Sequence, residues 1–376
     1  MLPLVGQFPY LKEIVVATAA IHLVARRRSQ DAPIGRELVD ALSARERAIK
    51  LLQVALDNIN ESNRPAVLVS VVFFVNFELI DSGKGGWKAH LEAAGTLIRS
   101  LHGNEPRKHR NQNATDYAMM GLGDMVIADC LTYHILGSTL SRLDETAAQI
   151  YDGIDISAVL RKAEAHSYHC CPPDILQIVA QASRIHSVMA GMPGNDMGSA
   201  RAAGATAAVL LSRALAVDVR SWVESIDNLS PDDDRETRIK IASAHRAAAC
   251  LYILLCVPPA VSQFWDIQLS ADALADEILH HMYSIPAEHE LFKGTVWPAF
   301  MAGSQTDDPA RREWCLDNIR SLWTSSPLIC PWGYVNTAAQ MLQQVWAARD
   351  AQPVEQRAHW NWLTELKSSR DSCLIV

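Results

Sequence analysis

The chain has 376 residues, of which 49% are hydrophobic and 20% charged, and a formal net charge of −8. So apolar a chain can bury a large core, which excludes a largely disordered protein. The acidic balance excludes a generally basic surface for nucleic acid. The length allows one large domain or two smaller ones.

Apolar residues recur at helical spacing along nearly the whole chain. Residues 67–79 are apolar on all sides, which predicts a central helix. The other predicted helices are, in chain order, 46–59, 87–101, 119–136, 174–190, 198–225, 232–256, 271–284, 313–323 and 335–349. No strand-type alternation and no linker divides them, so we predict an all-α protein. One large multi-helix domain spans 1–350, and a C-terminal helix and tail span 351–376.

Breaker residues mark the connections between these helices. A glycine-rich turn follows the central helix at 81–86, and residues 103–114 form a polar loop with a basic run at 107–110. That run is too short for a nucleic-acid site of its own. The last four residues, Cys373-Leu-Ile-Val, formally match a prenylation box but end in an atypical Val, so we expect an ordinary frayed tail.

The cysteines and the apolar runs indicate where the protein resides. None of the eight cysteines forms a C-x-x-C pair, which leaves a structural zinc site without a frame. Free thiols fit a reducing compartment, and we expect a cytoplasmic protein. The longest apolar runs, 67–80 and 247–261, fall short of the roughly 20 residues that span a bilayer, and no signal peptide is evident, so we expect no membrane span.

Motifs for nucleotide binding, serine hydrolysis and zinc proteolysis are absent from the sequence. The acidic run from Asp232 to Glu236 follows Ser-Pro at a helix start. Helix capping therefore explains it better than magnesium binding does.

Two carboxylates in apolar sequence are candidate metal ligands. Asp124 and Asp129 lie in a predicted helix, and Asp129 shares a face with Val126 and Tyr133. A buried carboxylate is costly unless it is hydrogen-bonded, paired or metal-bound. A structural hydrogen bond and a metal ligand both satisfy that condition, and the same two alternatives apply to Glu78.

Lys293 stands in a segment rich in apolar and aromatic residues, between His289 and Pro298. A lysine at the edge of a pocket would serve as a point charge for phosphate. A surface lysine whose stem covers apolar neighbours is the alternative.

Three segments together resemble the fungal-specific transcription factor domain, an all-helical region that usually follows a zinc binuclear cluster. Residues 78–97 look like its Trp-x-x-His-Leu-x-Gly-Ala-x-x-Leu signature, with Ala93 in place of the expected Gly. Cys171-Pro-Pro-Asp-Ile-Leu is similar to its Gly-Cys-Pro-x-Glu-Leu helix start. The strongest match is Val296-Trp-Pro-Ala-Phe-Met-Ala-Gly303, followed by a helix that ends at Trp346-Ala-Ala-Arg-Asp350. The resemblance extends from the first helix to about residue 350.

The sequence begins at this helical domain and has no six-cysteine cluster, so we expect no direct contact with nucleic acid. One interpretation is a regulatory protein, nuclear in location, that acts by binding proteins or small molecules. The other is the branch of unconventional fungal sesquiterpene cyclases that resembles this domain. That resemblance implies a lyase of secondary metabolism that converts farnesyl diphosphate to a humulene-type hydrocarbon with Mg²⁺ and an essential lysine.

The cyclase interpretation is favoured here because it unites the buried acids, the lysine and the missing DNA-binding module. Lys293 would then bind the diphosphate as the catalytic lysine, with Mg²⁺ held by Asp124 and Asp129. Aromatic faces of a water-excluding cavity would stabilise the allylic cation; they are assigned to Tyr133, Phe292 and Trp297. A homodimer is compatible with either interpretation.

Overall fold

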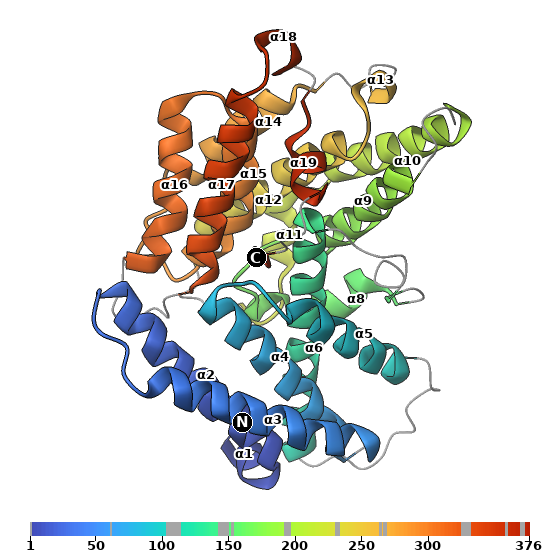
Figure 1. Ribbon diagram of the computed structural model, residues 1–376. Coiled ribbons are helices and arrows are strands. Elements are labelled where there is room, and N and C mark those ends of the chain that lie inside the picture. Colours follow the sequence, from blue (N-terminus) through green and yellow to red (C-terminus); the bar gives the residue numbers. More distant parts are fainter. Residues whose placement is uncertain are drawn as a thin grey trace.

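The computed structural model describes residues 2–60, 62–102, 114–141, 150–151, 154–191, 197–229, 234–262, 265, 269–324, 332–357, 360–368 and 373–376. Within these ranges every regular element is a helix and none is a strand, which confirms the predicted all-α fold (Figure 1). The basic run at 107–110 and the first two acids of the run at 232–236 lie outside the described residues.

The bounds of the helices follow the sequence. In chain order they are α1 (Leu2–Gln7), α2 (Pro9–Ser29), α3 (Glu37–Asp57), α4 (Arg64–Asp81), α5 (Trp87–His102), α6 (Ala114–Leu140), α8 (Ile156–Arg161), η1 (Glu164–His166), α9 (Pro173–Gly191), α10 (Met197–Leu215), α11 (Val219–Ser225), α12 (Arg235–Leu255), α13 (Pro259–Ser262), α14 (Ala271–Met282), η2 (Phe292–Thr295), α15 (Val296–Gln305), α16 (Pro309–Thr324), α17 (Tyr334–Asp350), α18 (Val354–Arg357) and α19 (Trp362–Ser368).

Two buried helices organise the core. Helix α4 is buried on nearly all sides, as predicted for residues 67–79, and packs against α2, α5 and α6. Helix α12 plays the same part in the other half, where it packs against α9, α10, α14 and α15. The pair α2 and α3 forms a hairpin at one edge of the molecule (Figure 1). Small alanines on the buried face of α3 allow the two helices to approach closely.

The predicted helix 198–225 is wrong in one respect, since it is divided into α10 and α11. The chain leaves α10 after Leu215, and the carboxylate of Asp218 then accepts the backbone N–H of Ser221 at 3.0 Å. This N-cap starts a new helix where apolar periodicity alone suggested continuity. Asp234 caps α12 in the same way through the N–H of Thr237 at 2.9 Å, which confirms the capping interpretation for this residue.

The expectation of a frayed tail is also wrong, because residues 373–376 are buried at the centre of the molecule. The backbone N–H of Leu374 donates to the carbonyl of Gly83 at 2.9 Å, and the hydroxyl of Tyr334 donates to the carbonyl of Val376 at 2.7 Å. Gly83 has a φ of +69°, and a Cβ there would lie 2.5 Å from the Cβ of Tyr334. The tail is therefore held by the turn after α4 and by α17.

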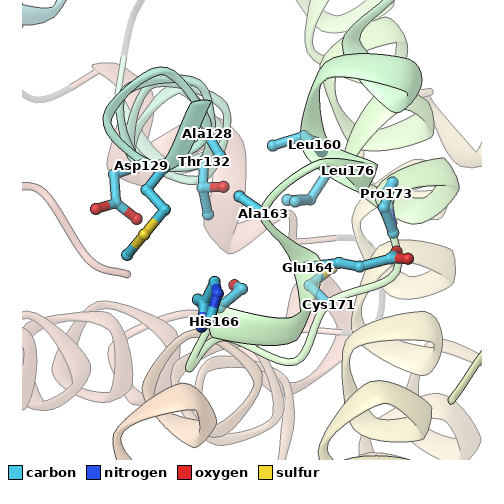
Figure 2. Close-up of a pocket in the computed structure, with 12 residues that line it drawn as sticks. Ala128, Asp129, Thr132, Leu160, Ala163, Glu164, His166, Cys171, Pro173 and Leu176 are labelled. Carbon is cyan, nitrogen blue, oxygen red and sulfur yellow. The ribbon is translucent and has the colours of Figure 1, made fainter. Parts of the chain in front are cut away.

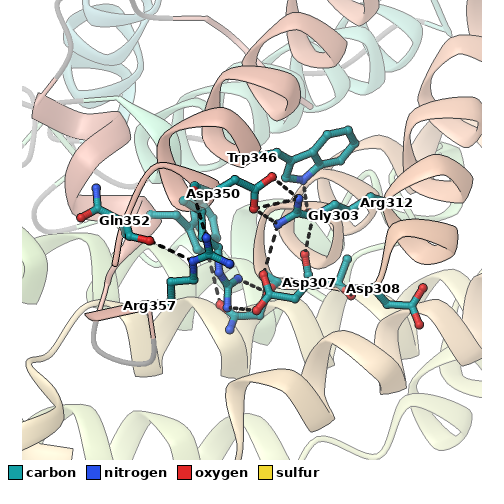
Figure 3. Close-up of polar contacts among 12 residues, drawn as sticks. Gly303, Asp307, Asp308, Arg312, Trp346, Asp350, Gln352 and Arg357 are labelled. Carbon is teal, nitrogen blue, oxygen red and sulfur yellow. Dashed lines mark hydrogen bonds and ion pairs between the residues drawn. The ribbon is translucent and has the colours of Figure 1, made fainter. Parts of the chain in front are cut away.

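A cluster of charged residues joins the last helices (Figure 3). The guanidinium of Arg312, on α16, lies 2.9 Å from a carboxylate oxygen of Asp350 and 3.1 Å from one of Asp307. The indole N–H of Trp346 donates to the carbonyl of Gly303 at 2.8 Å. The segments 296–303 and 346–350, which carry the strongest family resemblance, thus lie side by side.

No single helix among the described residues is both long and apolar enough to cross a membrane. One pair of successive helices, Gly198–Leu215 and Val219–Ser225, is long and apolar enough when the two are taken together, but the pair is bent by 61°.

Candidate functional site

A polar cluster forms where α6, η2 and the segment before α9 meet. The ammonium of Lys293 lies 3.9 Å from the centre of the Tyr168 ring, a cation–π contact. The hydroxyl of Tyr168 lies 3.2 Å from that of Tyr133. Two residues singled out separately in the sequence, Lys293 and Tyr133, are therefore brought together, and the residue that joins them was not predicted.

Asp129 faces the same cluster and lines a cavity of about 30 Å³ with Thr132, His166 and Cys171 (Figure 2). Burial raises the pKa of the Asp129 carboxyl to about 6, although the nearby charge of Lys293 acts in the opposite direction. A cavity of this size has room for one or two water molecules but not for a ligand, since ligand pockets measure about 300–1,000 Å³.

Phe292 and Trp297, the other predicted cavity residues, are part of the packed core. The indole N–H of Trp297 donates to the hydroxyl of Thr139 at 2.9 Å, and its ring stacks on His245 at 5.5 Å. Burial lowers the pKa of His245 to about 4. Neither Phe292 nor Trp297 lines the cavity at Asp129.

The two predicted metal ligands do not meet. Asp124 and Asp129 are five residues apart on α6, which turns their side chains about 140° from each other. Asp124 instead lies 3.9 Å from the ammonium of Lys162. Among the residues that the structure describes, no three of His, Cys, Asp or Glu come close enough to hold a metal ion. These residues do not fit a magnesium site.

Glu78 has a structural partner. Its carboxylate pairs with Arg45 of α3, which ties the N-terminal hairpin to the end of α4. Burial raises the pKa of the Glu78 carboxyl, and the charge of Arg45 acts against that rise. The hydrogen-bonded alternative therefore describes this residue.

A larger groove of about 650 Å³ opens beside η1 and shares Glu164 and His166 with the small cavity. Trp222, on α11, also lines this groove, and its indole N–H donates to the carboxylate of Glu164 at 3.0 Å. Burial raises the pKa of the Glu164 carboxyl, and that hydrogen bond acts in the opposite direction. A second hollow of about 380 Å³ shares Trp222 with the groove.

Opposite charges also meet in this groove. The guanidinium of Arg161 binds both carboxylate oxygens of Asp174, at 3.0 and 2.9 Å. The hydroxyl of Ser157 donates to the same carboxylate at 2.6 Å. Asp174 is thus neutralised locally and held at the start of α9, next to Pro173. Sequence reasoning missed this groove because its residues come from four separate elements.

Comparison with known proteins gives two matches. A family model described as the fungal specific transcription factor domain matches residues 1–375. The acriflavine sensitivity control protein acr-2 of Neurospora crassa is 43% identical over 381 residues, a match that covers the whole chain and 62% of that protein. The chain thus spans about three-fifths of the length of the curated relative that it matches. No solved structure matches it.

These matches overturn the cyclase expectation. The family and the relative point to a regulator, so the predicted conversion of farnesyl diphosphate by a lyase is wrong. The physical basis of the error is visible in the cluster, where the charge of Lys293 acts on Asp129. Burial of this carboxyl is met in part by a raised pKa and in part by the nearby lysine, and neither implies a metal or a diphosphate.

Proposed function

The chain belongs to the fungal specific transcription factor domain family, and on that premise we propose that it is the helical regulatory domain of a nuclear protein that controls sensitivity to acridine-type dyes. The observation that carries the proposal is the match to the acriflavine sensitivity control protein over the whole length of this chain. An identity of 43% over the whole chain supports the same fold and a related role.

The architecture supports a role in binding and signalling. The N-terminal hairpin, the turn after α4, α17 and the tail are linked through Arg45–Glu78 and Leu374–Gly83 contacts. A ligand or partner that shifts one of these elements acts on the others, because packed interfaces transmit displacement rather than absorb it. The groove beside η1 is the candidate receptor surface in this domain.

Gene deletion tests the proposal. Strains that lack the gene are grown on a series of acriflavine concentrations and compared with the parent and with a complemented strain. We expect a reproducible shift in the inhibitory concentration, restored by complementation, and altered transcript levels of efflux or detoxification genes after exposure to the dye. Unchanged sensitivity and an unchanged transcript response would contradict the proposal.

Location and regulatory output are tested separately. A fluorescent fusion of the full-length protein should accumulate in the nucleus. The present chain, fused to a heterologous DNA-binding domain, should change the expression of a reporter when acriflavine is added. A fusion that is folded and nuclear but leaves the reporter unaltered, with and without the dye, would place the regulatory activity outside this domain.

A further inference from the structure

The geometry points to the groove between η1 and α11 as a binding site for a planar aromatic cation. This inference rests on the proposed function, because acriflavine is itself a flat tricyclic cation. The groove measures about 650 Å³, within the range of small-molecule pockets. It also offers both features that such a ligand needs, an aromatic face and an excess of carboxylates over cations.

The aromatic face belongs to Trp222. Trp222 lines both the groove and the 380 Å³ hollow, which also share Asp174. The hydrogen bond from its N–H to Glu164 fixes the ring with respect to η1. A fixed indole is the best of the protein side chains for stacking a cation, since its face carries negative potential.

The charge of the groove favours a cation. Three carboxylates line it, those of Glu164, Asp174 and Asp227. Two cations line it as well: Arg161, which pairs with Asp174, and Lys162, which lies 3.9 Å from Asp124 outside the groove. Within the described residues, neither Glu164 nor Asp227 has an ion-pair partner. Burial raises the pKa of the Glu164 carboxyl, and the charge of Asp227 adds to that rise, whereas the Trp222 hydrogen bond and the charge of Arg161 act in the opposite direction.

The adjoining hollow, which shares Trp222 and Asp174 with the groove, accounts for the apolar part of such a ligand. Pro172, Ile178 and Val217 line it, and the aliphatic stem of Arg213 borders them. A tricyclic ring stacked on the indole would place its charged edge toward Glu164 and its hydrocarbon edge toward these residues. The site thus combines desolvation of a flat ring with neutralisation of its charge.

Titration of purified protein with acriflavine, followed by the fluorescence anisotropy of the dye, tests the inference. We expect saturable binding at one site that weakens with added salt, because screening reduces the attraction between the dye and the carboxylates. Acridone, a neutral tricycle with the same ring skeleton, should bind at least about fivefold more weakly. Equal affinity for acridone, or salt-independent binding, would overturn the assignment of a cation site.

Variants locate the site. Glu164→Gln and Asp227→Asn should each weaken binding roughly five- to tenfold, and Trp222→Leu roughly three- to thirtyfold. Glu224→Gln is the matched control: it removes the same charge from α11 but does not line the groove, so its affinity should stay within about twofold of wild type. Asp227 is exposed, so Asp227→Asn keeps the test valid if the tryptophan variant fails to fold.

The outcomes separate this inference from the function on which it rests. If the deletion strain shows altered sensitivity but the purified chain does not bind the dye, or Glu164→Gln and Trp222→Leu bind as wild type, the groove assignment is overturned alone. If binding follows the expected pattern and complementation with Glu164→Gln fails to restore the parental sensitivity, the groove is the receptor site. Unaltered sensitivity on deletion removes the proposed function itself.

Discussion

Replacing Asp129 by Asn should stabilise the protein, because the native carboxylate is held in a site that disfavours its charge. Burial raises the pKa of Asp129 from its ordinary value of 3.8 to about 6. The folded state therefore binds the proton more tightly than the unfolded state, and stability declines as the pH rises from about 4 to about 6. At pH 7 the full difference is present, about 3 kcal/mol.

This energy converts to a measurable shift in melting temperature. An unfolding entropy of about 2.1 cal/mol/K per residue gives about 0.8 kcal/mol/K for 376 residues, so 3 kcal/mol corresponds to about 4 °C. The neutral amide that this substitution introduces resembles the protonated acid, and we expect Asp129→Asn to melt about 4 °C higher at pH 7.5. At pH 5 the wild-type acid is mostly protonated when folded, and the gap should narrow to about 2 °C.

Differential scanning calorimetry at pH 5, 6 and 7.5 provides the measurement. Asp124→Asn is the matched control, since it makes the same change one turn and a half earlier on α6, at a partly exposed carboxylate 3.9 Å from Lys162. The control should change the melting temperature by less than about 1 °C at every pH. Two results would refute the reasoning. If Asp129→Asn melts lower than wild type at pH 7.5, the charge of Asp129 stabilises the folded protein through Lys293. If the difference in melting temperature does not vary with pH, the protonation of Asp129 is not its cause.

Three further predictions concern packing and protonation. Leu374→Ala should reduce the free energy of unfolding by about 2–5 kcal/mol in urea titrations, because its side chain lies against Gly137, next to Trp87, in the core; a loss below about 1 kcal/mol would mean that the tail is not held there. Gly294→Ala should lower the melting temperature, since its Cβ would lie 2.5 Å from the carbonyl oxygen of Tyr168, whereas Gly123→Ala, with open space around it, should be neutral or stabilising by up to about 1 kcal/mol. Unfolding at pH 5 should take up protons, measured from calorimetric enthalpies in buffers of different ionisation heat, because burial lowers the pKa of His90 and His245 to about 4 and that of His186 to about 3. These histidines stay neutral when the protein is folded and become protonated when it unfolds below pH 6.5, so their contribution to stability is present above that pH and is lost as the pH falls. A net release of protons on unfolding at pH 5 would contradict this prediction.

Periodicity predicted the core helices well because their apolar faces decide where they lie. Helix α4 was recognised from its uninterrupted apolar run, and α9 and α12 from the Pro and Asp residues at their starts. Helix α2 was missed, since Val16 and Leu23 on its exposed side blur the contrast between its two faces. Helix α15 was recognised as a motif but not as a helix, because it is short and contains Pro298.

The site could be predicted only in part, because it depends on contacts between distant segments. Composition and spacing marked Asp129, Tyr133 and Lys293 as unusual, and the structure places them in one cluster. Nothing in their spacing showed that the acid, the lysine and Tyr133 lie in one cluster. The groove was invisible for the same reason, since Glu164 and Trp222 are 58 residues apart.

The buried tail has a consequence for the synthesis of the protein. Ser82 and Cys373, 291 residues apart in sequence, lie in contact at the centre of the fold. At about 5–20 residues per second, the ribosome completes the tail roughly 15–60 s after the turn at 82–86 has formed. Until then the core lacks the Leu374 side chain, and the apolar surface of Trp87 and Gly137 that it covers stays exposed. The N-terminal half therefore cannot complete its packing until residues 373–376 have been synthesised.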